Sequence, residues 1–193
     1  MEATVDPITL FGEWLKDAGA HELNDSNAAA LATATSDGVP NVRMVLAKQA
    51  DERGFSFYTN AESQKGLELA ENPRAAMCFH WKSLRRQVRI VGPVSELPAE
   101  EADSYFRSRP RLSQLGAVAS DQSRVLASRE VLEARVKEVD ARFPGAIQRP
   151  AYWRGYLLRP ERMEFWIGRE GRLHDRFLYV RDGDGWVKTL LFP

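Results

Sequence analysis

Cations and hydroxyl groups are concentrated between Asn41 and Gly66, where they flank short apolar runs. They include the cations Arg43, Lys48 and Lys65 and the hydroxyls of Tyr58, Thr59 and Ser63. Ser63 is a suitable N-cap for a helix that ends before Pro73. A helix N-terminus has unpaired N–H groups and the positive end of a dipole, so cations and hydroxyls beside it suit a phosphate. A hairpin with a solvated charged rim is the alternative interpretation.

A second group of polar residues lies between Tyr105 and Ser113. Tyr105 and Arg109 are four positions apart, so they share one face of a helix. Ser113 follows Pro110, at the expected start of the next helix. These side chains could hold a second anion, and a solvated helix end is the alternative.

A third group lies near the C-terminus, where Arg172, His174 and Arg176 alternate with Leu173 and Asp175. Alternate residues of a β-strand project from the same face, so a strand here would place the three basic side chains together. Clustered cations repel one another, which makes an anion their natural partner. A histidine among them could exchange a proton near physiological pH. The alternative is a hairpin edge with alternating charges.

Hydrophobic periodicity predicts the elements that position these groups. Helices are expected over residues 8–20, 63–72, 98–108, 112–119 and 128–143. Strands are expected over residues 28–35, 42–48, 55–59, 74–81, 84–95, 152–158, 162–167, 173–180 and 185–191. Many strands, with helices in the interior of the sequence, indicate an antiparallel barrel or sandwich. We expect one domain over residues 1–193, with an N-terminal helical segment at 1–27 and a helical insertion at 98–143.

Composition excludes several classes of function. The 193 residues carry 27 basic and 27 acidic side chains, so zero net charge gives no general attraction to nucleic acid or membranes. No apolar run approaches the roughly 18 residues that span a bilayer. The N-terminus has no signal-peptide core, so we expect a cytoplasmic protein. One cysteine and three scattered histidines argue against a metal site. Nucleotide-binding and nucleophile motifs are also missing.

The three groups, in this order, resemble the pyridoxine/pyridoxamine 5′-phosphate oxidase family. The resemblance runs from about Asp6 to Pro193, and its motifs are R-M-V-L-A-K, F-Y-T-N-x-E-S-x-K-G, R-R-Q-V-R, Y-F-x-S-R-P-x-x-S, Q-S, P-x-Y-W and E-F-W followed by R-L-H-D-R. It implies a mainly β fold with helices (α+β), namely an FMN-binding split β-barrel of antiparallel Greek-key type with peripheral helices. It also implies a homodimer with FMN at the subunit interface.

The resemblance further implies oxidation of pyridoxamine or pyridoxine 5′-phosphate to pyridoxal 5′-phosphate, with dioxygen as acceptor and hydrogen peroxide as product. The implied FMN contacts are Arg43, Met44, Val45, Leu46, Ala47, Lys48, Tyr58, Thr59, Gln64, Lys65, Gln87, Gln122, Ser123, Trp166 and Arg176. The implied substrate contacts are Lys48, Tyr105, Arg109, Ser113, Arg172 and His174. Arg172 and His174 are the implied catalytic residues over the substrate ring, although hydride transfer needs alignment more than a strong base.

The sequence departs from many relatives at three places. Gln64 stands where they have arginine, Leu190 to Pro193 replaces an R-L-x-P ending, and the segment 1–7 contains no arginine. Two other functions remain as alternatives, a related FMN oxidase acting on a phenazine-type ring and a non-catalytic flavin- or pyridoxal-phosphate-binding protein. The phosphate-binding group argues against the first, and Arg172 and His174 argue against the second.

Strand parity separates two of the implied FMN contacts. Arg43 and Lys48 are five positions apart, so in a regular strand they point to opposite faces. The resemblance therefore places Arg43 and Lys65 toward the FMN phosphate, and Lys48 between the flavin ring and the substrate.

Overall fold

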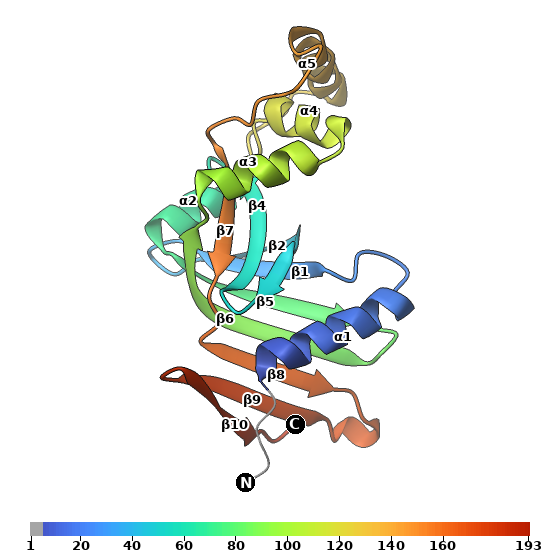
Figure 1. The fold of residues 1–193 in the computed structure, drawn as a ribbon, viewed down its shortest axis with the longest axis vertical. Coiled ribbons are helices and arrows are strands. Elements are labelled where there is room, and N and C mark those ends of the chain that lie inside the picture. The colour runs from blue at the N-terminus through green and yellow to red at the C-terminus, as the bar shows by residue number, and fades with distance from the viewer. Residues whose placement is uncertain (1–5) are drawn as a thin grey trace.

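The computed structural model describes residues 6–193, which form a curled antiparallel sheet with helices at its side and at one end (Figure 1). The strands are β1 (Ala28–Ala34), β2 (Pro40–Leu46), β3 (Gln49–Asp51), β4 (Gly54–Asn60), β5 (Arg74–Trp81), β6 (Arg86–Glu96), β7 (Trp153–Leu158), β8 (Arg162–Ile167), β9 (Asp175–Asp182) and β10 (Gly185–Leu190). The helices are α1 (Pro7–His21), α2 (Gln64–Glu71), α3 (Ala99–Ser108), α4 (Arg111–Ala119), α5 (Arg129–Arg142) and a short 3₁₀ turn, η1 (Glu170–Arg172).

Strand β6 joins the two parts of the sheet. The main order is β10-β9-β8-β6-β5-β1-β2, while β7 pairs with β6 and β4, and β3 pairs with β4. Residues 86–91 of β6 pair with β8, and residues 94–96 pair with β7. Gly92 lies at this change of partner, where a Cβ atom would come within 1.8 Å of the Arg159 carbonyl oxygen. Strand β6 continues through Gly92-Pro93 and changes its neighbour there.

Helix α1 covers one face of the sheet through an aromatic core. The ring of Phe11 lies 4.8 Å from that of Phe55 and 4.9 Å from that of Phe79. Trp14 packs edge-on against Phe165 at 5.1 Å. Because strand side chains alternate between faces, the neighbours of these residues lie on the opposite face, which α1 leaves uncovered.

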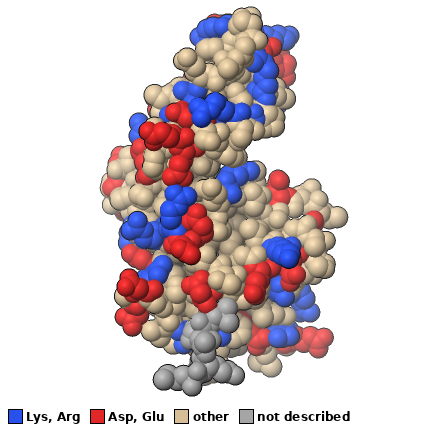
Figure 2. Space-filling model, in the orientation of Figure 1, with Lys and Arg blue, Asp and Glu red and all other residues tan. Residues whose placement is uncertain are grey.

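Helices α3, α4 and α5 form a layer at one end of the sheet, beyond β4 and β7 (Figure 1). Their own buried cluster consists of Phe106, Leu115, Ala119, Val139, Ile147 and Trp153. On the face that Figure 2 presents, acidic and basic side chains are interspersed rather than gathered in one field. Within residues 6–193 no helix has the length and apolar character needed to cross a membrane.

Most predicted elements are confirmed to within two or three residues, and the clearest error lies before β9. The predicted strand over 173–180 begins only at Asp175, and Arg172 lies in the turn η1. Gly171 and Arg172 both have φ of 62°, a left-handed conformation that a strand does not accommodate. Arg172 and His174 are therefore presented by a turn and a loop. The three-residue strand β3 was also not predicted, because a pairing so short leaves little hydrophobic pattern.

Candidate functional site

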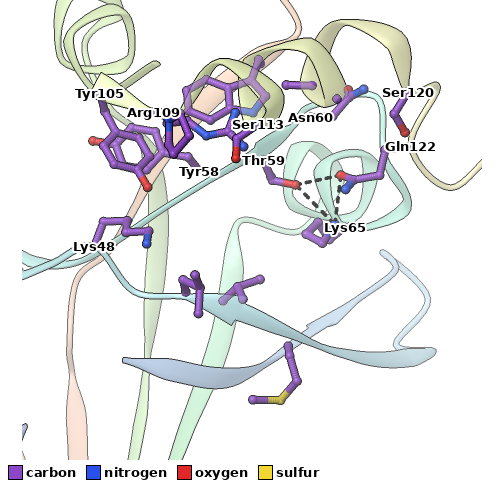
Figure 3. A pocket seen from close by; sticks show the side chains of 17 residues that line it. Lys48, Tyr58, Thr59, Asn60, Lys65, Tyr105, Arg109, Ser113, Ser120 and Gln122 are labelled. Carbon is purple, nitrogen blue, oxygen red and sulfur yellow. Dashed lines mark hydrogen bonds between the residues drawn. The ribbon is translucent and has the colours of Figure 1, made fainter. Parts of the chain in front are cut away.

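A cavity of 610 Å³ lies between β2, β4 and the helical layer (Figure 3). The predicted contacts that line it are Met44, Val45, Leu46, Lys48, Tyr58, Thr59, Lys65, Tyr105, Arg109, Ser113 and Gln122. The apolar floor comes from β2, and the polar groups stand at two separate ends. The first two sequence groups are thus combined in one cavity.

Lys65 marks one end of the cavity. Ser63 caps α2, its Oγ accepting a hydrogen bond from the Gly66 amide at 3.4 Å, so that Lys65 lies in the first turn. Lys65 is 8% exposed, and its Nζ donates to Oγ1 of Thr59 and Oε1 of Gln122, each at 3.3 Å. Among residues 6–193 no carboxylate forms an ion pair with it. Burial, followed by the charge of Arg43, lowers the pKa of Lys65.

Behind Lys65, the buried carboxylate of Glu68 holds several predicted contacts in place. Its Oε2 lies 3.3 Å from Nη2 of Arg43, and its Oε1 accepts from Asn41 at 2.6 Å and from Gln64 at 2.9 Å. Although burial opposes ionisation, hydrogen bonds from Thr33 and Gln64 and the charge of Arg43 hold the pKa of Glu68 below its ordinary value. Arg43 and Gln64 are thus held by Glu68 and do not line the cavity.

Arg109 marks the other end of the cavity. It follows α3 directly, and its Nη1 atom is buried with no hydrogen-bond partner in residues 6–193. Burial lowers the pKa of its guanidinium, and Tyr105 opposes this effect. Ser113 lies in the first turn of α4, and Nζ of Lys48 is 5.9 Å from the centroid of the Tyr105 ring. This end is therefore also cationic and surrounded by hydroxyl groups (Figure 3).

The chain leaves β2 between Arg43 and Lys48. β2 ends at Leu46, and the amide of Lys48 donates to the Ser56 carbonyl at 2.9 Å as the chain turns toward β3. Arg43 consequently lies beside Glu68, whereas Lys48 lies beside Tyr105 at the opposite end of the cavity.

Several lining residues were missed from the sequence. Gly116, Ala117 and Ser120 follow Ser113 at helical spacing, so the predicted position of Ser113 could have identified them. Pro110 precedes Ser113 by three positions. Asn60 directly follows Thr59 at the end of β4. Trp153, the tryptophan of the P-x-Y-W motif, is both a buried member of the helical cluster and part of the cavity wall.

The remaining predicted contacts form a second group at the other side of the sheet. Gln87, Trp166 and Arg176 are direct neighbours in register on β6, β8 and β9, so they share one face. The ring of His174 lies 4.6 Å from that of Trp166. Its Nδ1 accepts a hydrogen bond from the Arg169 amide at 3.1 Å, which leaves Nε2 to donate in the neutral ring.

Most charges in this second group are balanced. Nε of Arg176 lies 2.8 Å from Oε1 of Glu164, and Arg169 and Asp175 form an ion pair at 2.7 Å. Nη1 of Arg176 also donates to the Phe192 carbonyl at 2.8 Å. Arg172 is exposed. Glu164 also pairs with Arg89 at 3.2 Å, so Arg176 shares its carboxylate partner with a second arginine.

The sheet keeps the two groups apart within one chain. Met44 on β2 is linked to Glu164 on β8 through successive partners on β1, β5 and β6. Four strand spacings correspond to roughly 19 Å along the sheet.

Three further predicted FMN contacts, Ala47, Gln64 and Ser123, do not line the cavity. Oγ of Ser123 accepts a hydrogen bond from the Gln64 amide at 3.2 Å.

Two family models match this chain. Residues 15–143 match the model described as pyridoxamine 5′-phosphate oxidase, and residues 153–193 match the pyridoxine 5′-phosphate oxidase C-terminal dimerisation region. The chain belongs to the pyridoxamine 5′-phosphate oxidase family. The family resemblance is therefore confirmed, and the match to a dimerisation region supports homodimer formation.

Relatives and solved structures agree with this membership. The chain is 56% identical to the pyridoxine/pyridoxamine 5′-phosphate oxidase of Gluconobacter oxydans (strain 621H), covering 100% of this chain and 97% of the relative. It is 59% identical to the protein of that name from Sinorhizobium fredii (strain NBRC 101917 / NGR234), covering 97% and 93%.

Among solved structures, PhzG from Burkholderia lata 383 in complex with tetrahydrophenazine-1-carboxylic acid superposes with a TM-score of 0.93 at 38% identity, covering 100% of this chain and 95% of that one. A pyridoxamine 5′-phosphate oxidase-related, FMN-binding protein from Nostoc punctiforme PCC 73102 gives a TM-score of 0.78 at 16% identity, covering 99% and 100%. The predicted split-barrel fold is confirmed.

Proposed function

We propose that this protein is an FMN-dependent oxidase that converts pyridoxamine and pyridoxine 5′-phosphate to pyridoxal 5′-phosphate, with dioxygen as acceptor and hydrogen peroxide as product. The observation that carries the proposal is one cavity with a cation at each end, Lys65 and Arg109, neither ion-paired with a carboxylate of residues 6–193. Two phosphate monoesters, one on the cofactor and one on the substrate, would balance both. The names of relatives at 55–59% identity support the same activity.

The Lys65 end fits the phosphate of FMN. Oε1 of Gln122 accepts from Oγ1 of Thr59 at 3.0 Å and from Lys65 at 3.3 Å, so these two donors converge on a single oxygen position. A phosphate oxygen would have the same donors there, beside the positive end of α2. The ion pair with Glu68 holds Arg43 nearby, outside the cavity lining.

The Arg109 end fits the phosphate of the substrate. Arg109 presents an unpaired buried N–H, and Ser113, Tyr105 and Lys48 add a hydroxyl, a phenol and a second cation. A planar guanidinium binds phosphate oxygens with fixed geometry, which orients the rest of the substrate. The oxidation itself, in which a hydride leaves the 4′ carbon and the electrons pass to dioxygen, is the chemistry that FMN supplies when bound.

A second copy of the chain would complete the site. Strand β8, which carries Trp166 of the second group, lies four strand spacings, roughly 19 Å along the sheet, from the β2 cavity floor of its own chain. The floor beside the cavity carries exposed apolar side chains, with Val42 68% and Met44 64% exposed. A homodimer that covers this face would bring the second group of one copy to the cavity of the other, with FMN between them.

In that arrangement Arg172 and His174 would lie over the substrate ring. Arg172 would place positive charge near the reacting carbon, and the Nε2–H of His174 would donate a hydrogen bond to the ring substituents. Neither residue is required as a strong base. The cytoplasmic location and the single-domain organisation stay predictions from the sequence.

Turnover of two substrates tests this proposal against its alternatives. The purified flavin-loaded protein is mixed with pyridoxamine 5′-phosphate under air, and pyridoxal 5′-phosphate and hydrogen peroxide are measured. We expect both products in equal amounts. A reduced phenazine carboxylate serves as the comparison substrate, because PhzG carries such a molecule. Oxidation of the phenazine alone would establish the phenazine function, and oxidation of neither would indicate a binding protein.

A further inference from the structure

Trp153 contacts the residues proposed to hold the substrate phosphate. Its side chain is 5% exposed, yet it forms part of the cavity wall. The Cζ atom of Arg109 lies 4.9 Å from the centroid of its ring. The rings of Tyr58 and Tyr105 lie 5.4 Å and 6.0 Å away and are nearly parallel to it, at 12° and 18°. The indole is therefore stacked beside the cation and the phenol at this end of the cavity.

Arg109 depends on this contact for its position. No hydrogen bond or ion pair within residues 6–193 restrains its guanidinium, and one of its nitrogens is buried without a partner. The aromatic contacts are what remain, and the Phe106 ring is farther from Cζ, at 5.9 Å. A guanidinium over an indole face is attracted by the ring's electron density, most strongly where water is excluded.

Trp153 is itself fixed from two sides. It is the first residue of β7, where it pairs in register with Asn60 on β4. Its carbonyl accepts from Nη1 of Arg149 at 2.6 Å, and Nε of Arg149 lies 2.6 Å from Oδ1 of Asp103 on α3. The indole is thus tied both to the sheet that forms the cavity and to the helix that carries Tyr105. A rigid ring in this place defines where Arg109 can lie.

We propose that Trp153 is a positioning residue for the substrate phosphate, holding Arg109 and Tyr105 in the geometry that binds it. The proposal rests on the proposed function, because it concerns the phosphate end of that substrate. A purely structural Trp153 would affect all ligands of the cavity alike, through the helical cluster. A positioning Trp153 would affect only ligands that carry a phosphate at the Arg109 end.

The test compares a phosphorylated with an unphosphorylated substrate in the flavin-loaded protein. kcat and KM are measured for pyridoxamine 5′-phosphate and for pyridoxamine, together with the inhibition constant of inorganic phosphate. We expect Trp153→Leu to lower the ratio of the two kcat/KM values about tenfold, mainly through the KM of the phosphorylated substrate. The inhibition constant of phosphate rises by a similar factor. Trp153→Phe keeps an aromatic face and recovers most of the loss.

Ile147→Ala is the matched control, because Ile147 is buried in the same cluster and does not line the cavity. It should lower thermal stability and leave the ratio unchanged. An unchanged ratio in Trp153→Leu, or an equal decrease in Ile147→Ala, would overturn the positioning role. If Trp153→Leu does not fold, Trp153→Phe must still show a smaller decrease in the same direction. Absence of any turnover by the wild-type protein would instead contradict the proposed function.

Discussion

The two groups of basic residues differ in how their charges are balanced. In the cavity, Lys65 donates only to neutral oxygens, and Arg109 has a buried nitrogen with no partner within residues 6–193. On the sheet, Arg176 is paired with Glu164 and Arg169 with Asp175. An unbalanced cation loses solvation without compensation, so a protein retains it where an anion binds. We therefore expect the cavity group to supply affinity for phosphate and the sheet group to supply orientation.

The largest effect should follow from removing the guanidinium at the substrate end. Arg109→Ala is expected to raise the KM for pyridoxamine 5′-phosphate about 100-fold, since a charge-assisted interaction with a desolvated phosphate contributes about 2–3 kcal/mol. The dissociation constant of FMN, followed by flavin fluorescence, should change less than about threefold. Arg107→Ala, near the end of α3, is the control, because Arg107 is exposed and does not line the cavity. Equal losses for substrate and cofactor would show that the two ends are not distinct.

A somewhat smaller effect is expected at the cofactor end. Lys65→Met should weaken FMN binding about 30-fold, because it removes the cation proposed to bind the FMN phosphate. Riboflavin lacks the phosphate, so its affinity should fall less than about threefold. Fluorescence titration of both flavins gives the two constants, and the exposed Lys82→Met provides the control. A parallel loss of riboflavin affinity would mean that Lys65 supports the cavity only structurally.

The lowered pKa of Lys65 predicts a specific dependence on alkaline pH. Burial makes the neutral amine easier to form in the free protein, whereas a bound phosphate favours the charged form and raises the pKa. Binding therefore takes up a proton, and FMN affinity should fall by up to about tenfold per pH unit above the pKa of the free protein. The decline should begin at a lower pH than an ordinary lysine would give. Lys65→Met should lack it, and persistence of the decline would assign it to another group.

The smallest effect is expected from the sheet group. Arg172→Ala should lower kcat about fivefold, because Arg172 is exposed and proposed to orient the ring rather than to bind phosphate. The inhibition constant of inorganic phosphate should stay unchanged. Steady-state kinetics measure both quantities, with Arg169→Ala as a neighbouring control whose partly exposed ion pair contributes little. A large rise in the phosphate inhibition constant would erase the distinction between the two groups.

The sequence predicted the residues that line the cavity better than it predicted the hydrogen bonds and ion pair of Glu68 that support them. Local spacing placed Ser63 as a cap, which holds in the structure. It also placed Tyr105 with Arg109, and both line the cavity, although Arg109 lies just after the end of α3 rather than on the helix. Glu68 could not be found in this way. Its partners Thr33 and Asn41 lie on strands about 30 residues away, and only the folded chain brings them to α2.

Two further errors have physical causes. Polar and apolar residues alternate around Arg172, which is the pattern of a β-strand and led to the strand prediction. The left-handed backbone at Gly171 turns the chain there instead. Trp153 was not predicted as a cavity residue, because a cavity wall in a small protein is also part of its core and spacing does not distinguish the two. The balance of each charge depends on contacts distant in sequence, so it could not be predicted from spacing alone.

The central claim is that each chain binds two phosphate monoesters at opposite ends of one cavity. The most direct test is ³¹P NMR of the FMN-loaded protein with pyridoxal 5′-phosphate bound, in the wild type, Arg109→Ala and Lys65→Met. We predict two protein-bound phosphate signals of equal intensity, with the signal of pyridoxal 5′-phosphate lost in Arg109→Ala and that of FMN weakened in Lys65→Met. A single bound signal, or the loss of both in either folded variant, would contradict the account.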